Sequence, residues 1–204
     1  PTYSLTISDA NSALLPSGKI LQAAVASTLR KTFIYDPSTN TAVAGPASSG
    51  IHNESAWVTL PDNSVLFVDR LATTSERYIP SSNTWVADAT VPVGLYDPWG
   101  DETGGAILLP NGKAFFIGST DGNAGTPGTT AIYTPSGSTS PGTWAAGATI
   151  PNVPGGGGVQ AAPDAASAMM VNGKIYAFPD DGDVFVIYYR KDLFADPGLQ
   201  KDFK

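Results

Sequence analysis

The sequence predicts an all-β protein built from about four repeated four-stranded units, which is the architecture of a β-propeller. Two observations lead to this prediction: a short strand–turn–strand pattern occurs four times, and a second pattern follows its first three copies. The composition agrees, because 22 glycines and 17 prolines with only 14% charged residues are typical of many short strands joined by turns.

The first pattern is a hairpin with its turns at residues 16–18, 61–63, 110–112 and 171–173. The apolar runs on both sides are too short for helices and are rich in Val, Ile, Phe and Leu, which favours strands. Glycine or asparagine occupies the third position of every turn, where a tight hairpin requires a positive φ. Each turn is therefore predicted to join the first and second strands of a unit.

The second pattern is Tyr-x-Pro, with its tyrosine at Tyr35, Tyr78 and Tyr133. Each tyrosine is predicted to lie near the end of a third strand, followed by a turn rich in Ser and Asn and then by a fourth strand. That last strand carries Trp85 or Trp144 in the second and third units, whereas the first unit has alanine there. We expect the three tyrosines, and likewise the two tryptophans, to occupy equivalent positions. Trp57, inside another strand, is expected to be structural as well.

Together the two patterns resemble the kelch repeats of galactose-oxidase-like propellers, and the run from Ser75 to Pro80 is similar to bacterial secreted members of that group. The resemblance implies blades at about residues 5–46, 50–92, 99–151 and 160–189, with a C-terminal tail at 190–204. The radical-copper oxidases of this fold need several histidines and a tyrosine crosslinked to cysteine. This sequence has no cysteine and one histidine, so the resemblance extends to the fold and not to that chemistry.

Four units are fewer than the six or seven blades usual in kelch propellers. An open array leaves strand edges and inner faces uncovered, so self-association or membership of a longer chain is favoured over a closed four-bladed ring. A β-sandwich with similar hairpins is the alternative architecture.

Charge and composition exclude several partners. The net charge is −7 and the eleven Lys and Arg residues are scattered, which argues against binding nucleic acid. No apolar run approaches the ~20 residues of a membrane span. Low charge with abundant Ser, Thr and Asn favours a secreted or periplasmic protein.

Acidic residues precede the first strand of every unit. Loops that lead into the innermost strands of a propeller share one face, so these carboxylates are expected to converge near the axis. They could bind Ca²⁺, accept hydrogen bonds from sugar hydroxyls, or act as an acid/base pair in which Glu54 and Glu102 are the candidate catalytic residues. Alternatively, each is an ordinary loop residue that faces water. The candidate Ca²⁺ ligands are Asp9, Glu54, Glu102 and Asp164, and Asn53 and Asp101 are candidate ligand-binding neighbours.

Trp99 precedes two of these acids in the long loop before the third unit. An aromatic ring beside carboxylates is typical of sugar binding, although Trp99 could instead fill space between blades. His52 is expected on the same face, more often exposed than catalytic, because no G-x-S-x-G nucleophile motif accompanies it.

Three functions follow from these patterns. The favoured one is a carbohydrate-recognition module that binds through one face of the central channel. The alternatives are a hydrolase acting on a sugar or lactone with channel carboxylates or Ca²⁺, and a structural or assembly protein without a small ligand.

Overall fold

The computed structural model describes residues 10–24, 30–95, 103–118 and 128–150, together with the backbone of 166–169 and 175–178. All regular structure in these ranges is β, as the sequence predicts. No helix in the described ranges is long and apolar enough to cross a membrane.

Three four-stranded antiparallel sheets and one two-stranded pair follow one another along the chain. Sheet 1 contains β1 (Ser12–Leu14), β2 (Ile20–Ala23), β3 (Thr32–Asp36) and β4 (Thr41–Ala44). Sheet 2 contains β5 (Trp57–Thr59), β6 (Val65–Val68), β7 (Ser75–Ile79) and β8 (Thr84–Ala87). Sheet 3 contains β9 (Ala106–Leu108), β10 (Ala114–Ile117), β11 (Thr130–Thr134) and β12 (Thr143–Ala146). The remaining pair is β13 (Ala166–Met169) with β14 (Ile175–Phe178).

Each of the three sheets is a simple meander, in which consecutive strands are neighbours. The hairpin turns at 16–18, 61–63 and 110–112 lie where the sequence predicts them, and the turn at 171–173 lies outside the described residues. Their third residues have φ values of +79° at Gly18, +67° at Asn63 and +78° at Gly112. The same backbone hydrogen bonds close each turn, as from the Leu60 amide to the Ser64 carbonyl at 2.8 Å. The left-handed residue is therefore what allows so short a connection.

Strand register confirms that Tyr35, Tyr78 and Tyr133 are equivalent. Tyr78 pairs with Trp85 across its sheet, and Tyr133 pairs with Trp144 in the same way. Tyr35 instead pairs with alanine, so the first unit has a smaller side chain where the others have a tryptophan. The repeats read from the sequence are thus repeats of structure.

Apolar layers fill the spaces between successive sheets. Residues from sheet 1 and sheet 2 form one cluster, in which Leu21 and Val65 are fully buried and Trp57 and Trp85 pack at the margin. A larger cluster joins sheet 2 to sheet 3 around Leu66. Alternate residues of each strand point to opposite faces, so sheet 2 contributes to both layers.

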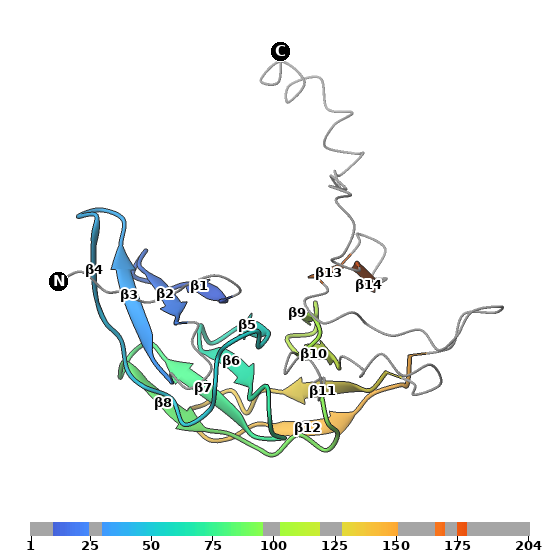
Figure 1. Ribbon diagram of the computed structural model, residues 1–204. Coiled ribbons are helices and arrows are strands. Elements are labelled where there is room, and N and C mark those ends of the chain that lie inside the picture. Colours follow the sequence, from blue (N-terminus) through green and yellow to red (C-terminus); the bar gives the residue numbers. More distant parts are fainter. Residues whose placement is uncertain are drawn as a thin grey trace, which may run out of the picture.

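Consecutive sheets approach each other through their first strands. Contacts link β1 to β5, β5 to β9, and β9 to β13. Figure 1 shows the three sheets following an arc, with their first strands on the inner side and their fourth strands on the outer side. The strands β1, β5 and β9 all begin at the same end of their sheets, and we call this end the leading end. The opposite end, with the turns at 16–18, 61–63 and 110–112, is the hairpin end.

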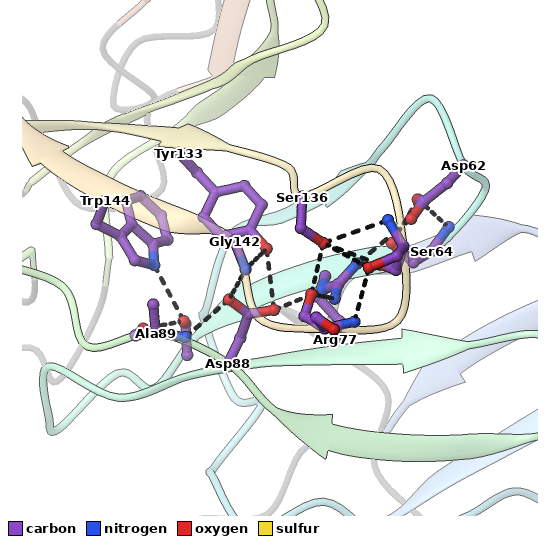
Figure 2. Close-up of polar contacts among 12 residues, drawn as sticks. Asp62, Ser64, Arg77, Asp88, Ala89, Tyr133, Ser136, Gly142 and Trp144 are labelled. Carbon is purple, nitrogen blue, oxygen red and sulfur yellow. Dashed lines mark hydrogen bonds and ion pairs between the residues drawn. The ribbon is translucent and has the colours of Figure 1, made fainter.

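A buried ionic network also joins sheet 2 to sheet 3 (Figure 2). Arg77 on β7 is fully buried, and its Nε lies 2.5 Å from the Asp88 carboxylate, which is buried too. Its Nη1 lies 3.3 Å from Asp62 and donates to the Ser138 carbonyl at 3.1 Å, while Nη2 donates to the Ser140 carbonyl at 2.6 Å. The guanidinium thus holds the β11–β12 loop against sheet 2.

Asp88 completes this network from the other side. Its carboxylate accepts hydrogen bonds from the Tyr133 hydroxyl at 2.9 Å and from the Gly142 amide at 3.0 Å. Burial, and then the charge of Asp88, raise the pKa of Tyr133, which keeps this phenol protonated and able to donate. Arg77 and Asp88 both depart from the repeat: the equivalent residues are Ile34 and Ile132 for Arg77, and Gly45 and Gly147 for Asp88.

Candidate functional site

The segments that lead into the three first strands meet at residues 53–55. Ala10 forms a β-bridge with Asn53, and the Asn11 side chain donates to the Ser55 carbonyl at 2.6 Å. From the other side, the Thr103 amide donates to the Glu54 carbonyl at 3.1 Å. The leading ends of units 1, 2 and 3 are therefore held together around Asn53 and Glu54.

Glu54 has an unusual backbone conformation, with φ at +55°. Few side chains other than glycine adopt this region, and strained residues of this kind cluster at functional sites. The Glu54 carboxylate lies 3.8 Å from Nη1 of Arg70, and the side chains are 19% and 6% exposed, respectively. A carboxylate and a guanidinium therefore lie side by side at the leading end, largely shielded from water.

Asn53, which precedes Glu54 in the sequence, carries a further acceptor. The residue is buried, and its Oδ1 has no hydrogen-bond partner. A buried polar atom without a partner is uncommon, because it loses its hydration without compensation. An incoming hydroxyl or amide donor would satisfy it.

His52 corrects an expectation, because it is fully buried rather than exposed. Its ring packs against Phe67, Trp85 and Trp57 at centroid distances of 4.2, 4.7 and 5.2 Å, and neither ring nitrogen has a partner. Burial lowers its pKa to about 3, so the ring is neutral at ordinary pH. This environment gives His52 no nucleophile to activate.

The repeat explains why His52 is buried. The amide of Gly45 donates to the Thr32 carbonyl, and the amide of Asp88 donates to the Ser75 carbonyl in the same way, so Gly45 and Asp88 are equivalent. His52 follows Gly45 at the same spacing as Leu95 follows Asp88. Leu95 is 1% exposed and belongs to the next apolar layer. His52 thus occupies a position that the following unit gives to leucine.

Of the seven predicted ligand-binding residues, the structure describes Asn53 and Glu54, which are neighbours in the sequence. The other five, Asp9, Trp99, Asp101, Glu102 and Asp164, lie outside the described residues. Arg70 was missed, because only the fold shows that the second residue after β6 comes close to Glu54. Within the described ranges, no group of three or more His, Cys, Asp or Glu side chains could hold a metal ion.

Two grooves lie at the hairpin end, opposite the predicted acidic face. The larger has a volume of about 680 Å³ and runs between the first two hairpins, beside Tyr78 and the 80–83 turn. The smaller, of about 390 Å³, lies between the second and third hairpins. Both are lined by Asp62 and Gly137, so they adjoin. Sequence analysis did not identify them, because their walls come from different units.

No family model matches the chain, and no curated protein sequence matches it. Its structure resembles that of a novel fungal alcohol oxidase with catalytic diversity among the AA5 family, solved in complex with copper. The TM-score is 0.57 at 18% sequence identity, over 85% of this chain and 37% of the oxidase. The likeness shows a similar fold, and this chain spans little more than a third of the oxidase's length.

The described residues do not fit a copper site. The chain's single histidine is His52, which is enclosed by aromatic rings with both ring nitrogens turned to apolar surroundings. Cysteine is absent from the sequence. Copper in proteins is held mainly by nitrogen and sulfur ligands, and one enclosed histidine without any cysteine cannot supply several of them.

Proposed function

We propose that this chain is a segment of a galactose-oxidase-like propeller that binds carbohydrate at its leading end. The observation that carries the proposal is the meeting of three units at Asn53 and Glu54. In a propeller the corresponding loops surround the axis, which is where ligands of such folds are bound.

The propeller part of the proposal is supported by the packing of the sheets. Successive sheets bury apolar residues from the same strand positions between them, and the first strand of each sheet contacts the first strand of the next. The similarity to the oxidase fold extends over 85% of the chain. A β-sandwich would instead place two sheets face to face with their strands aligned. Successive meanders on an arc favour radial blades over that arrangement (Figure 1).

The chemistry of the site suits a polyhydroxyl ligand. Glu54 supplies a charged acceptor, Arg70 a planar donor, and Asn53 a buried acceptor without a partner. Sugar hydroxyls both donate and accept, so they can engage all three groups. Ala10 forms a β-bridge with Asn53, and Thr103 hydrogen-bonds to the Glu54 carbonyl. Asp9 and Glu102 are their neighbours in the sequence. The other candidates from the sequence stay part of the proposal, although they lie outside the described residues: Asp9, Trp99, Asp101, Glu102 and Asp164.

A glycan array followed by calorimetry tests this function. The wild-type protein should bind a subset of glycans, and Glu54→Gln should weaken that binding at least about tenfold, because a hydrogen bond to a charged group contributes about 1.5–3 kcal/mol. Lys31→Gln is the control, since it removes an exposed charge that lines neither groove and lies outside the proposed site. Binding by Glu54→Gln at wild-type affinity, or the absence of any glycan bound by the wild type, would contradict the proposal.

A further inference from the structure

The two hairpin-end grooves form a surface that repeats with the units. The larger groove lies beside the turn at 16–18 and the smaller beside the turn at 110–112, and the turn at 61–63 separates them. Each of the three turns begins with a proline and is closed by the same backbone bonds. A surface that presents the same features at the spacing of one unit fits a ligand that also repeats along its length.

The difference in size between the grooves has a cause in the sequence. In the layer between sheets 2 and 3, Arg77 projects from β7 and binds the carbonyls of Ser138 and Ser140 in the long β11–β12 loop. The equivalent position in sheet 1 is Ile34, which lines the larger groove and is shorter. The β7–β8 turn that faces it is also shorter than the β11–β12 loop. Less of the space between the sheets is therefore filled, and a groove of about 680 Å³ remains, within the range of ligand sites.

The lining is amphipathic and electrically neutral. Leu15, Ile34 and Ile79 supply apolar surface, and hydroxyl and amide side chains surround it, among them Ser81 and Thr139. The larger groove has two charged residues, and each lies near a group of opposite charge. Lys19 lies 3.2 Å from Asp36. Asp62 lies 3.3 Å from Arg77, which also pairs with Asp88, and the smaller groove adds Lys113. Among these described residues, three cations (Lys19, Arg77 and Lys113) balance three carboxylates (Asp36, Asp62 and Asp88), so no net charge is left to attract a phosphate, a sulfate or a charged peptide.

The groove also lacks what an extended peptide would use. Peptides that add to a sheet pair with the open backbone of an edge strand. Here the walls are turns rather than an edge strand, and each hairpin turn is closed by its own backbone bonds, as from the Leu15 amide to the Lys19 carbonyl at 2.8 Å. Recognition must therefore come from side-chain hydroxyls, side-chain amides and apolar contact.

From neutrality, hydroxyl-rich walls and repetition, we infer that the hairpin end binds a neutral polysaccharide chain laid across both grooves. Apolar residues contact the ring faces, while Ser81 and Thr139 exchange hydrogen bonds with ring hydroxyls from opposite walls. Longer oligosaccharides should bind more tightly than short ones, because a chain that reaches the second groove binds there at high effective concentration. This surface is independent of the proposed site at the leading end.

Affinity electrophoresis in gels that contain neutral β-glucan, xylan or mannan provides the test. We expect the wild type to be retarded by at least one of the three polymers. Ser81→Arg and Thr139→Arg, each of which fills the larger groove from an exposed position, should weaken retardation at least about tenfold. Thr90→Arg, which places the same charge on an exposed residue at the leading end, is the control and should be retarded like the wild type. Unchanged melting temperatures show that the variants are folded.

The outcomes separate the two sites. Loss of retardation in Ser81→Arg but not in Glu54→Gln supports the groove, whatever the result for the leading end. Loss in Glu54→Gln alone, equal retardation of wild type and Ser81→Arg, or no retardation of the wild type would overturn the inference. Preference for a sulfated or phosphorylated polymer over all three neutral ones would overturn it as well.

Discussion

Replacing Arg77 with methionine should destabilise the protein by about 3–5 kcal/mol, the cost of removing one partner from a buried ion pair. Methionine keeps most of the side-chain volume, so the loss comes from the charge and the hydrogen bonds and not from a cavity. The Asp88 carboxylate would stay buried without its cation, and the Ser138 and Ser140 carbonyls would each lose a donor.

A double-mutant cycle shows how much of this cost belongs to the pair. The variant Arg77→Ile with Asp88→Gly gives sheet 2 the residues that sheets 1 and 3 have at the same positions. Buried pairs replaced together often leave stability nearly unchanged. We expect the double variant to be about 1–3 kcal/mol more stable than the sum of the single variants Arg77→Ile and Asp88→Gly predicts.

Urea unfolding followed by tryptophan fluorescence measures these changes, because Trp144 packs against Tyr133 and bonds to Ser75 beside the network. Arg30→Met is the control, since Arg30 is exposed and should change stability by less than about 0.5 kcal/mol. A loss below about 1 kcal/mol for Arg77→Met would refute this account of how sheets 2 and 3 are joined.

Two further predictions concern the layer between sheets 1 and 2. The pKa of His52 falls from 6.5 to about 3 on folding, so its contribution to stability is complete above pH 6.5 and is lost as the pH falls toward 3. The wild type should therefore lose more unfolding free energy between pH 7 and pH 4.5 than His52→Leu, which has the residue found at Leu95, and the difference should be about 2–3 kcal/mol. Identical pH profiles of unfolding free energy for both proteins would show that His52 is not buried as a neutral ring. Trp85→Ala should cost about 3–5 kcal/mol, because Trp85 packs against His52, Phe67 and Tyr78. A loss below about 1 kcal/mol in thermal or urea unfolding would mean that Trp85 does not support this layer.

The local parts of the fold could be predicted from the sequence because their causes are local. A hairpin turn requires a left-handed residue, and Gly18, Asn63 and Gly112 supply it. The Tyr-x-Pro pattern likewise marked the third strands, and the register agrees with the equivalence of Tyr78 and Tyr133. Both inferences needed only neighbours along the chain and their repetition.

Contacts between units could not be predicted in the same way. Arg77 lies on β7 and Asp88 directly follows β8, and both also bind groups of the next unit, as Arg77 does at the Ser140 carbonyl. A signal was present nonetheless, because both residues depart from apolar or glycine positions of the repeat. His52 was misjudged for a related reason: its acidic and amide neighbours suggested an exposed loop, whereas its spacing from Gly45 matches that of a buried leucine.

The account depends most on the radial arrangement of equivalent units, and an experimental structure of this protein tests it most directly. We predict that the three four-stranded sheets will be arranged as blades, with β1, β5 and β9 nearest a common axis and Asn53 and Glu54 facing that axis at the leading end. Sheets stacked face to face as a sandwich, with β1 and β9 on opposite outer edges, would contradict the account and both proposed binding surfaces.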